Sequence, residues 1–123
     1  MRTAVAIGVA GALGALARYG LDGAVARRAT AFPWATFVVN VSGSFLLGLV
    51  FTLFGERLTV APWVRGAIAI GFLGAYTTFS TLSLETYRLL ETRSVALAFA
   101  NIAGSAAAGL LALYGGVVLG RAL

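Results

Sequence analysis

The sequence predicts an all-α membrane protein with four transmembrane helices, the third of them broken. Three observations support this. Of the 123 residues, 60% are hydrophobic and 11% are charged, about half the charged share of an ordinary soluble domain. Long charge-free runs alternate with short stretches that contain arginine. One hydrophobic span also contains a segment rich in hydroxyl side chains. We therefore expect residues 1–123 to form a single four-helix membrane domain.

The composition excludes several classes of site. The chain has no cysteine and no histidine, which excludes a disulfide framework, a thiolate nucleophile and an imidazole-ligated metal. The net charge is +5, and all the basic residues are arginine. A basic chain can bind nucleic acid, but these arginines are scattered between apolar runs and form no stripe. We therefore predict no nucleic-acid partner, and we interpret the arginines as membrane-boundary residues.

The first helix is predicted over about residues 3–26. Its uncharged run, from Thr3 to Ala17, has only 15 residues, whereas a helix needs about 20 apolar residues to cross the bilayer core. It reaches that length only if Arg18 and Asp22 lie in or near the far interface. A signal peptide is the alternative, but no clear cleavage context leads into a polar domain. A first transmembrane helix is the preferred interpretation.

The other three helices are predicted over about residues 34–55, 62–91 and 94–120. Their charge-free runs contain 27, 19 and 27 residues, and they lie between Arg28 and Glu56, Arg65 and Glu85, and Arg93 and Arg121. Pro33 stands at a position where helices commonly start. Trp34 and Trp63 stand where interfacial aromatic residues belong. We therefore predict that the whole chain is embedded in the lipid bilayer.

Two of these helices have the same pattern of small and polar residues. Each has an asparagine, a serine and a glycine at positions i, i+4 and i+8: Asn40, Ser44 and Gly48, and Asn101, Ser105 and Gly109. Small residues at this spacing allow helices to approach closely in lipid. A buried asparagine must also find partners for its amide. We therefore expect both asparagines to bind other helices or to line a polar path.

The arginines predict no preferred orientation in the membrane. Four spans place both termini on one side, and the two sides then hold equal numbers of arginines: Arg2, Arg57, Arg65 and Arg121 on one, Arg27, Arg28, Arg88 and Arg93 on the other. Equal numbers give the positive-inside rule no bias, and Arg18 changes the difference by only one. A chain of this kind can insert both ways, which predicts an antiparallel, dual-topology homodimer.

The segment GAYTTFSTLSLE, residues 74–85, predicts the break in the third helix. Gly71 and Gly74 flank a point where the helix can unwind, and the hydroxyls of residues 77–81 can bind the released backbone groups. Irregular backbone at membrane depth needs surrounding protein or a watery cavity. Exposed carbonyls there can coordinate a cation, and exposed N–H groups can bind an anion. The alternative is an uninterrupted helix whose hydroxyls bind its own carbonyls.

The segment GFLGAYTTFSTLSLE (71–85) resembles the third-helix motif of the CrcB/Fluc fluoride channels. The resemblance continues through GALGALARY (11–19), PWATFVVNVSGSFLLG (33–48) and NIAGS (101–105), so it covers nearly the whole chain in order. It implies a fluoride-selective passive channel in the bacterial plasma (inner) membrane, which exports cytoplasmic fluoride down its gradient and lowers fluoride toxicity. It also implies an antiparallel homodimer with two pores and a structural sodium ion (Na+) at its centre.

The resemblance also implies roles for individual residues. The fluoride pore would be lined by seven residues: Asn40, Phe79, Leu82, Ser80, Thr81, Ser105 and Asn101. The backbone carbonyls of Gly74 and Thr77 match the sodium positions, while Arg18 and Glu85 match further motif residues. Two positions depart from the family pattern. Leu82 replaces a second phenylalanine, and Asn101 stands where some members have tyrosine.

These residue types suit fluoride, which is small and strongly hydrated. Amide and hydroxyl hydrogens can replace its water, and the positive edge of a phenyl ring can face an anion. Two other functions stay open. A small dual-topology, proton-coupled multidrug transporter would need an embedded acid, for which Glu85 is the candidate. A non-transporting scaffold would give Asn40 and the hydroxyls of residues 77–81 no purpose. No nucleophile–base pair suggests an enzyme.

Overall fold

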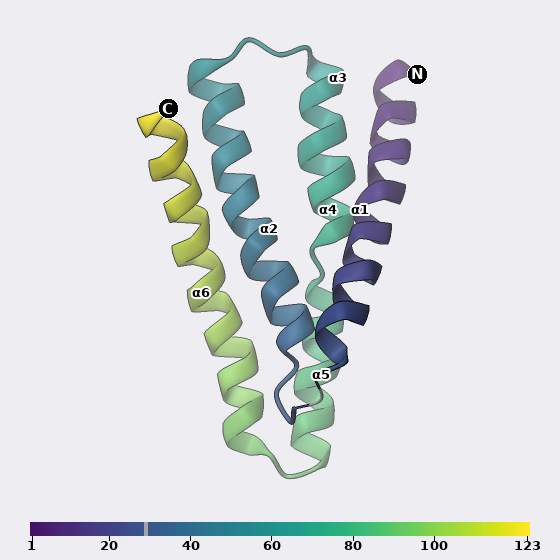
Figure 1. Cartoon of the computed structure of the whole chain (residues 1–123), viewed down its shortest axis with the longest axis vertical. Helices are drawn as coiled ribbons and strands as arrows, with labels where there is room; N and C mark the ends of the chain where they lie inside the picture. The colour runs from purple at the N-terminus through teal and green to yellow at the C-terminus, as the bar shows by residue number, and fades with distance from the viewer. Residues whose placement is uncertain (29) are drawn as a thin grey trace.

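The structure is a computed structural model that describes residues 1–28 and 30–123. It consists of six α-helices and two π-helical segments among these residues: α1 (Arg2–Ala26), α2 (Trp34–Thr52), η1 (Leu53–Arg57), α3 (Pro62–Arg65), η2 (Gly66–Phe72), α4 (Leu73–Tyr76), α5 (Phe79–Glu91) and α6 (Val95–Ala122). In space they form four long rods (Figure 1), because η1 continues α2 and because α3, η2, α4 and α5 follow one another in the third rod.

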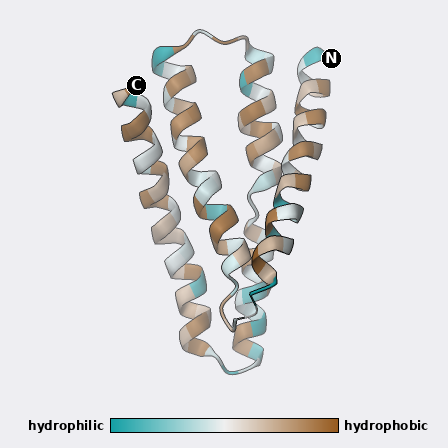
Figure 2. Ribbon diagram, in the orientation of Figure 1, coloured by the Kyte–Doolittle hydropathy of each residue, from teal (hydrophilic) through white to brown (hydrophobic). Residues whose placement is uncertain are grey.

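All four rods are long and apolar enough to cross a membrane: Arg2–Ala26, Trp34–Arg57, Pro62–Glu91 and Val95–Ala122. The predicted set of four membrane-spanning helices is confirmed, and each end lies within two residues of the predicted one. Hydrophobic residues cover all four rods, and hydrophilic residues gather toward their ends (Figure 2). Both chain termini lie at the same end of the bundle (Figure 1).

The third rod changes its neighbour along its length. Its first part, η2 and α4, packs against α1, whereas its second part, α5, packs against α6. Among single helices, the most extensive contact is that between α2 and α6. The point where the third rod passes from one neighbour to the other is therefore flanked by α2, which contacts both parts.

Glycines make the contact between α2 and α6 close. A Cβ added at Gly48 would meet the carbonyl oxygen of Leu113, and one added at Gly116 would meet the carbonyl oxygen of Phe45. The two backbones are therefore too close for a side chain to fit between them at these glycines. Such packing of small residues joins helices in lipid. Val39, also on α2, is completely buried within the bundle.

The third rod also approaches α1 closely through a glycine. The helix is not interrupted at Gly71 and Gly74, which were predicted to flank the break. Gly71 and Gly74 are both helical, in η2 and α4. A Cβ at Gly71 would lie 2.6 Å from the carbonyl oxygen of Ile7, so this glycine serves close packing rather than unwinding. Helical backbone instead ends after α4, where Thr77 (φ −82°, ψ 156°) and Thr78 (φ −151°, ψ 117°) are extended.

Candidate functional site

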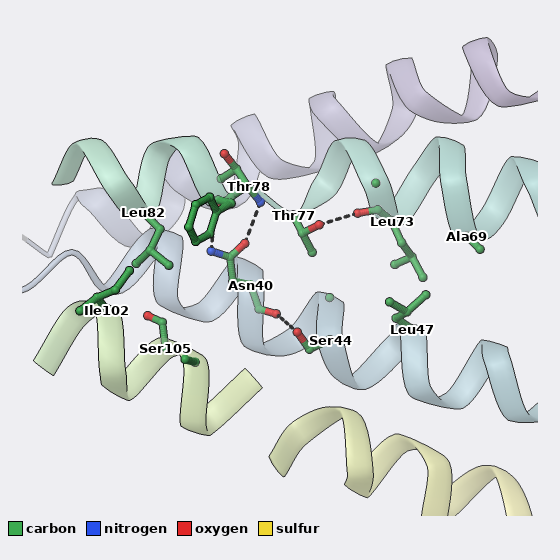
Figure 3. Close-up of a pocket in the computed structure, with 14 residues that line it drawn as sticks. Asn40, Ser44, Leu47, Ala69, Leu73, Thr77, Thr78, Leu82, Ile102 and Ser105 are labelled. Atoms are coloured by element: carbon green, nitrogen blue, oxygen red, sulfur yellow. Dashed lines mark hydrogen bonds between the residues drawn. The ribbon is translucent and has the colours of Figure 1, made fainter. Parts of the chain in front are cut away.

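Asn40 of α2 holds the extended residue Thr78 with both ends of its amide. Nδ2 donates to the Thr78 carbonyl oxygen at 2.9 Å, and Oδ1 accepts from the Thr78 N–H at 2.7 Å (Figure 3). Exchanging the amide oxygen and nitrogen would place donor against donor and acceptor against acceptor, so the two bonds fix the orientation of the amide. Asn40 therefore connects α2 to the non-helical point of the third rod.

Thr78 also begins α5. Its hydroxyl oxygen accepts from the backbone N–H of Thr81 at 3.2 Å, which is the usual bond of a helix N-cap. The same hydroxyl lies 3.0 Å from the Thr81 hydroxyl and 3.3 Å from that of Ser80. The predicted pore residues Ser80 and Thr81 thus belong to the hydrogen-bonded cap of α5.

The interruption releases two backbone carbonyls. In a continuous helix, each N–H bonds to the carbonyl four residues earlier. Here the Thr78 N–H bonds to Asn40 instead of Gly74, and the Thr81 N–H bonds to the Thr78 hydroxyl instead of Thr77. The carbonyl oxygens of Gly74 and Thr77 therefore lose their intrahelical donors. Neutral carbonyl oxygens from unwound backbone are suitable ligands for Na+.

These residues surround an open cavity of about 540 Å³ between α2, the third rod and α6. Among its lining residues are six of the predicted site residues: Asn40, Gly74, Thr77, Phe79, Leu82 and Ser105. Ser44 and Thr78 add further hydroxyls, while Leu47, Leu73 and Ile102 supply apolar wall. A mostly apolar cavity with a few convergent polar groups is the usual form of a small-ligand site. Among the described residues, its lining contains no charged side chain.

Phe79 and Leu82 lie one helical turn apart on α5 but at different depths. The Phe79 side chain is 74% exposed at the edge of the cavity, whereas Leu82 is only 6% exposed. Leu82 lies beside Ile102 and Ser105 of α6 (Figure 3). Phe79 is thus free to contact another molecule, while Leu82 forms part of the cavity wall.

Five predicted site residues lie outside the cavity lining: Ser80 and Thr81, which belong to the cap of α5, and Asn101, Glu85 and Arg18. Asn101 is fully buried and donates through Nδ2 to the Thr86 hydroxyl at 3.0 Å. Glu85 accepts through Oε1 from the hydroxyl of Thr36 at 2.7 Å, which links α5 to the first turn of α2. Arg18 lies partly buried on α1. The structure therefore does not bring Glu85 or Arg18 to the cavity.

The pair formed by Ser42 and Tyr76 was not predicted from the sequence. Their hydroxyl groups hydrogen-bond at 2.9 Å, and the Tyr76 ring stacks on Phe72 with ring centroids 6.0 Å apart. This pair ties α4 to α2 immediately before the interruption. The hydroxyl of a buried tyrosine usually has a hydrogen-bond partner. The presence of Tyr76 in an apolar span was therefore the feature of the sequence that could have indicated this contact.

A family model and several known proteins match nearly the whole chain. The family model described as CrcB-like protein, Camphor Resistance (CrcB), matches residues 5–117. Three similar proteins are each named fluoride-specific ion channel FluC. The one from Magnetococcus marinus is 47% identical over 94% of both chains, that from Stutzerimonas stutzeri is 43% identical over 98% of both, and that from Geobacter sulfurreducens is 43% identical over the full length of both.

Proposed function

The chain belongs to the CrcB family, and we propose that it is a passive, fluoride-selective channel that exports fluoride from the cytoplasm. It is a multi-pass protein of the bacterial inner membrane and is not an enzyme. One observation carries the proposal: an uncharged cavity at membrane depth combines the clamped amide of Asn40 with hydroxyls and the Phe79 ring. The names of the relatives support fluoride as the anion that this cavity would take.

Asn40 is well placed to donate to an anion. An asparagine amide has two N–H hydrogens, and one of them is bound to the Thr78 carbonyl oxygen at 2.9 Å. The second hydrogen is available to the cavity that Asn40 lines. Because the two bonds to Thr78 hold the amide rigid, this donor needs little reorganisation to meet fluoride. Neutral donors also bind an anion weakly enough for it to leave, as conduction requires.

The charge distribution favours a passive channel over a proton-coupled transporter. Export of one anion from a cell that is negative inside gains about 2.3 kcal/mol per 100 mV, so no coupled proton is needed. The transporter alternative depends on an acid in the transport path. Glu85, the candidate, lies outside the cavity lining and is bound by Thr36.

The open cavity supports an antiparallel homodimer. Its polar backbone and side-chain groups cannot face lipid, so protein or water must cover them. The exposed ring of Phe79 lies at its edge, and the balanced arginines allow both orientations. A second, inverted copy would cover the cavity and bring four carbonyl oxygens, two from each chain, to one site. Gly74 and Thr77 would hold a structural Na+ there, which would supply positive potential without a charged side chain.

Fluoride efflux from liposomes tests the proposed function. Purified protein in vesicles loaded with potassium fluoride should release fluoride to an electrode once valinomycin balances the charge, without a proton gradient. Vesicles loaded with chloride should release chloride far more slowly. Equal rates for both ions would contradict selectivity, and release that depends on a proton gradient would favour the coupled transporter.

Cysteine labelling tests the dual topology separately. The chain has no cysteine, so one cysteine added after Leu123 is a unique target. In sealed vesicles, an impermeant maleimide should label about half of the chains, and the rest should react only after the vesicles are opened. Labelling of all chains or of none before opening would show a single orientation and contradict the antiparallel dimer.

A further inference from the structure

Two buried polar atoms of α6 find no hydrogen-bond partner among residues 1–28 and 30–123: Asn101 Oδ1 and Ser105 Oγ. Asn101 is 0% exposed and Ser105 is 6% exposed. Buried polar groups are nearly always hydrogen-bonded, to protein or to ordered water. The two residues stand at i and i+4 on one helix, so their side chains share a face. Ser105 also lines the cavity.

The neighbouring bonds determine which atom of the Asn101 amide is left over. The Thr86 hydroxyl donates its single hydrogen to the Leu82 carbonyl oxygen at 2.8 Å. Its oxygen can therefore only accept at Asn101, which must present Nδ2 to it, at 3.0 Å. Oδ1 is then an acceptor that needs a donor. An anion cannot supply one.

We propose that Asn101 and Ser105 together bind one ordered water molecule on the α6 side of Leu82. The water would accept the Ser105 O–H hydrogen and donate one of its own hydrogens to Asn101 Oδ1. Buried waters commonly make about three such bonds. The second hydrogen of the water is then available to the cavity.

This water would give fluoride a donor where the wall is otherwise aliphatic. Leu82 and Ile102 offer an anion no hydrogen, and both lie beside Ser105 (Figure 3). A water held between Ser105 and Asn101 would present an O–H on the same wall. The water site itself depends only on the buried residues of α5 and α6. Its contribution to fluoride passage rests on the proposed function.

A structure of the wild-type protein, at a resolution that reveals water, tests the site directly. One water peak is expected at about 3 Å from both Asn101 Oδ1 and Ser105 Oγ, and it should be absent in Ser105→Ala and in Asn101→Leu. A side chain on Oδ1 in place of the water, from either copy of the chain, would overturn the proposal. So would no peak in the wild type.

Fluoride efflux tests the contribution of the water to passage. Ser105→Ala and Asn101→Leu should each slow efflux about tenfold, the effect of roughly one lost hydrogen bond to a charged group. Gly104→Ala is the matched control on α6, because a Cβ there meets nothing within 4 Å; its efflux should equal that of the wild type. If Asn101→Leu does not fold, Ser105→Ala carries the test. Efflux at the wild-type rate in the folded variants would overturn the role of the water in fluoride passage. A wild-type protein that releases no fluoride would overturn the proposed function. The water peak alone would then show whether the water site exists.

Discussion

The contact between α2 and α6 and the interruption of the third rod join helices in opposite ways. At the first, Gly48 and Gly116 each face backbone atoms of the other helix, so the two backbones meet directly at these points. At the second, a single amide, that of Asn40, holds the extended residue Thr78 beside a cavity of about 540 Å³. The first region fixes the shape of the bundle, and the second leaves space that an ion can use.

The energies of these contacts differ as well. Close packing of small residues is a main source of helix association in lipid, whereas a single side-chain hydrogen bond between membrane helices contributes about 0.6 kcal/mol on average. Loss of the Asn40 amide should therefore destabilise the bundle little. Substitutions in the α2–α6 contact should be seen in the amount of folded protein, and substitutions around the cavity should be seen in ion flux.

The largest effect is expected from Gly116→Val. Its Cβ would meet the carbonyl oxygen of Phe45 and lie 2.8 Å from the backbone nitrogen of Leu49, and backbone atoms cannot move aside as a side chain can. Overpacking of this kind typically costs about 1–3 kcal/mol or more. We expect a large loss of monodisperse protein in gel filtration. Gly104→Val, at an open position on the same helix, should purify normally; similar yields for both variants would contradict the proposed close contact.

Phe79→Ile should strongly reduce fluoride efflux and leave the fold intact. The ring is 74% exposed within one chain, so its removal costs little packing there, but isoleucine has no positive ring edge to face an anion. We expect efflux to fall at least about tenfold, which corresponds to about 1.4 kcal/mol. Phe99→Ile provides the control, because Phe99 is 71% exposed on α6; an equal loss there would mean that any exposed aromatic side chain matters.

Leu82→Ala should reduce efflux less than Phe79→Ile. The leucine is a buried part of the cavity wall, so the substitution enlarges the cavity without removing a group that binds an anion. A stability loss of about 2–5 kcal/mol is typical of such a truncation and should appear as a lower melting temperature. Equal flux losses for the two variants, each normalised to folded protein, would indicate that the site requires volume rather than the ring edge.

Leu82→Phe should have the smallest effect. The larger side chain adjoins the cavity and has space to extend into it, so overpacking should be mild compared with that in a filled core. Efflux within about twofold of the wild-type rate is expected, since the change adds a ring edge and removes no donor. A large flux loss in a well-folded variant would instead show that the aliphatic wall is required at this position.

The sequence was sufficient to predict the four spans because lipid imposes their length and composition. Charge-free runs bounded by residues such as Arg28, Glu56 and Arg93 marked the ends closely. Asn40 and the hydroxyl-rich segment 74–85 could also be singled out in advance as polar features, whereas the pore roles of Phe79, Leu82 and Ser105 came only through the family motif. Their chemical types alone did not define a cavity.

The sequence could not separate two roles of glycine. The sequence places Gly71 beside a possible point of unwinding, but the role of this glycine depends on Ile7 of a different helix, whose carbonyl oxygen a Cβ would approach to 2.6 Å. The bonds between Asn40 and Thr78 join residues 38 apart in the chain, and local side-chain patterns do not identify such distant pairs. Asn101 shows the same limit, because its orientation depends on where the Thr86 hydrogen points.

The proposed channel requires that the amide of Asn40, held against Thr78, faces the fluoride path. Fluoride efflux by Asn40→Asp at neutral pH tests it most directly, with Ser44→Ala as the control. Ser44 lines the same cavity, but its hydroxyl is bound to the Asn40 carbonyl oxygen at 2.7 Å. Aspartate has no N–H to donate, and two like charges 4 Å apart repel by about 4 kcal/mol at an effective dielectric constant of 20.

We therefore expect Asn40→Asp to elute as folded protein in gel filtration. Its fluoride efflux should be about 100-fold slower than that of the wild type, or not measurable, because even half of that repulsion would slow passage by well over tenfold. Ser44→Ala should conduct at nearly the wild-type rate. Folded Asn40→Asp protein with near-normal fluoride efflux would contradict the account, because it would remove the clamped amide from the path of the ion.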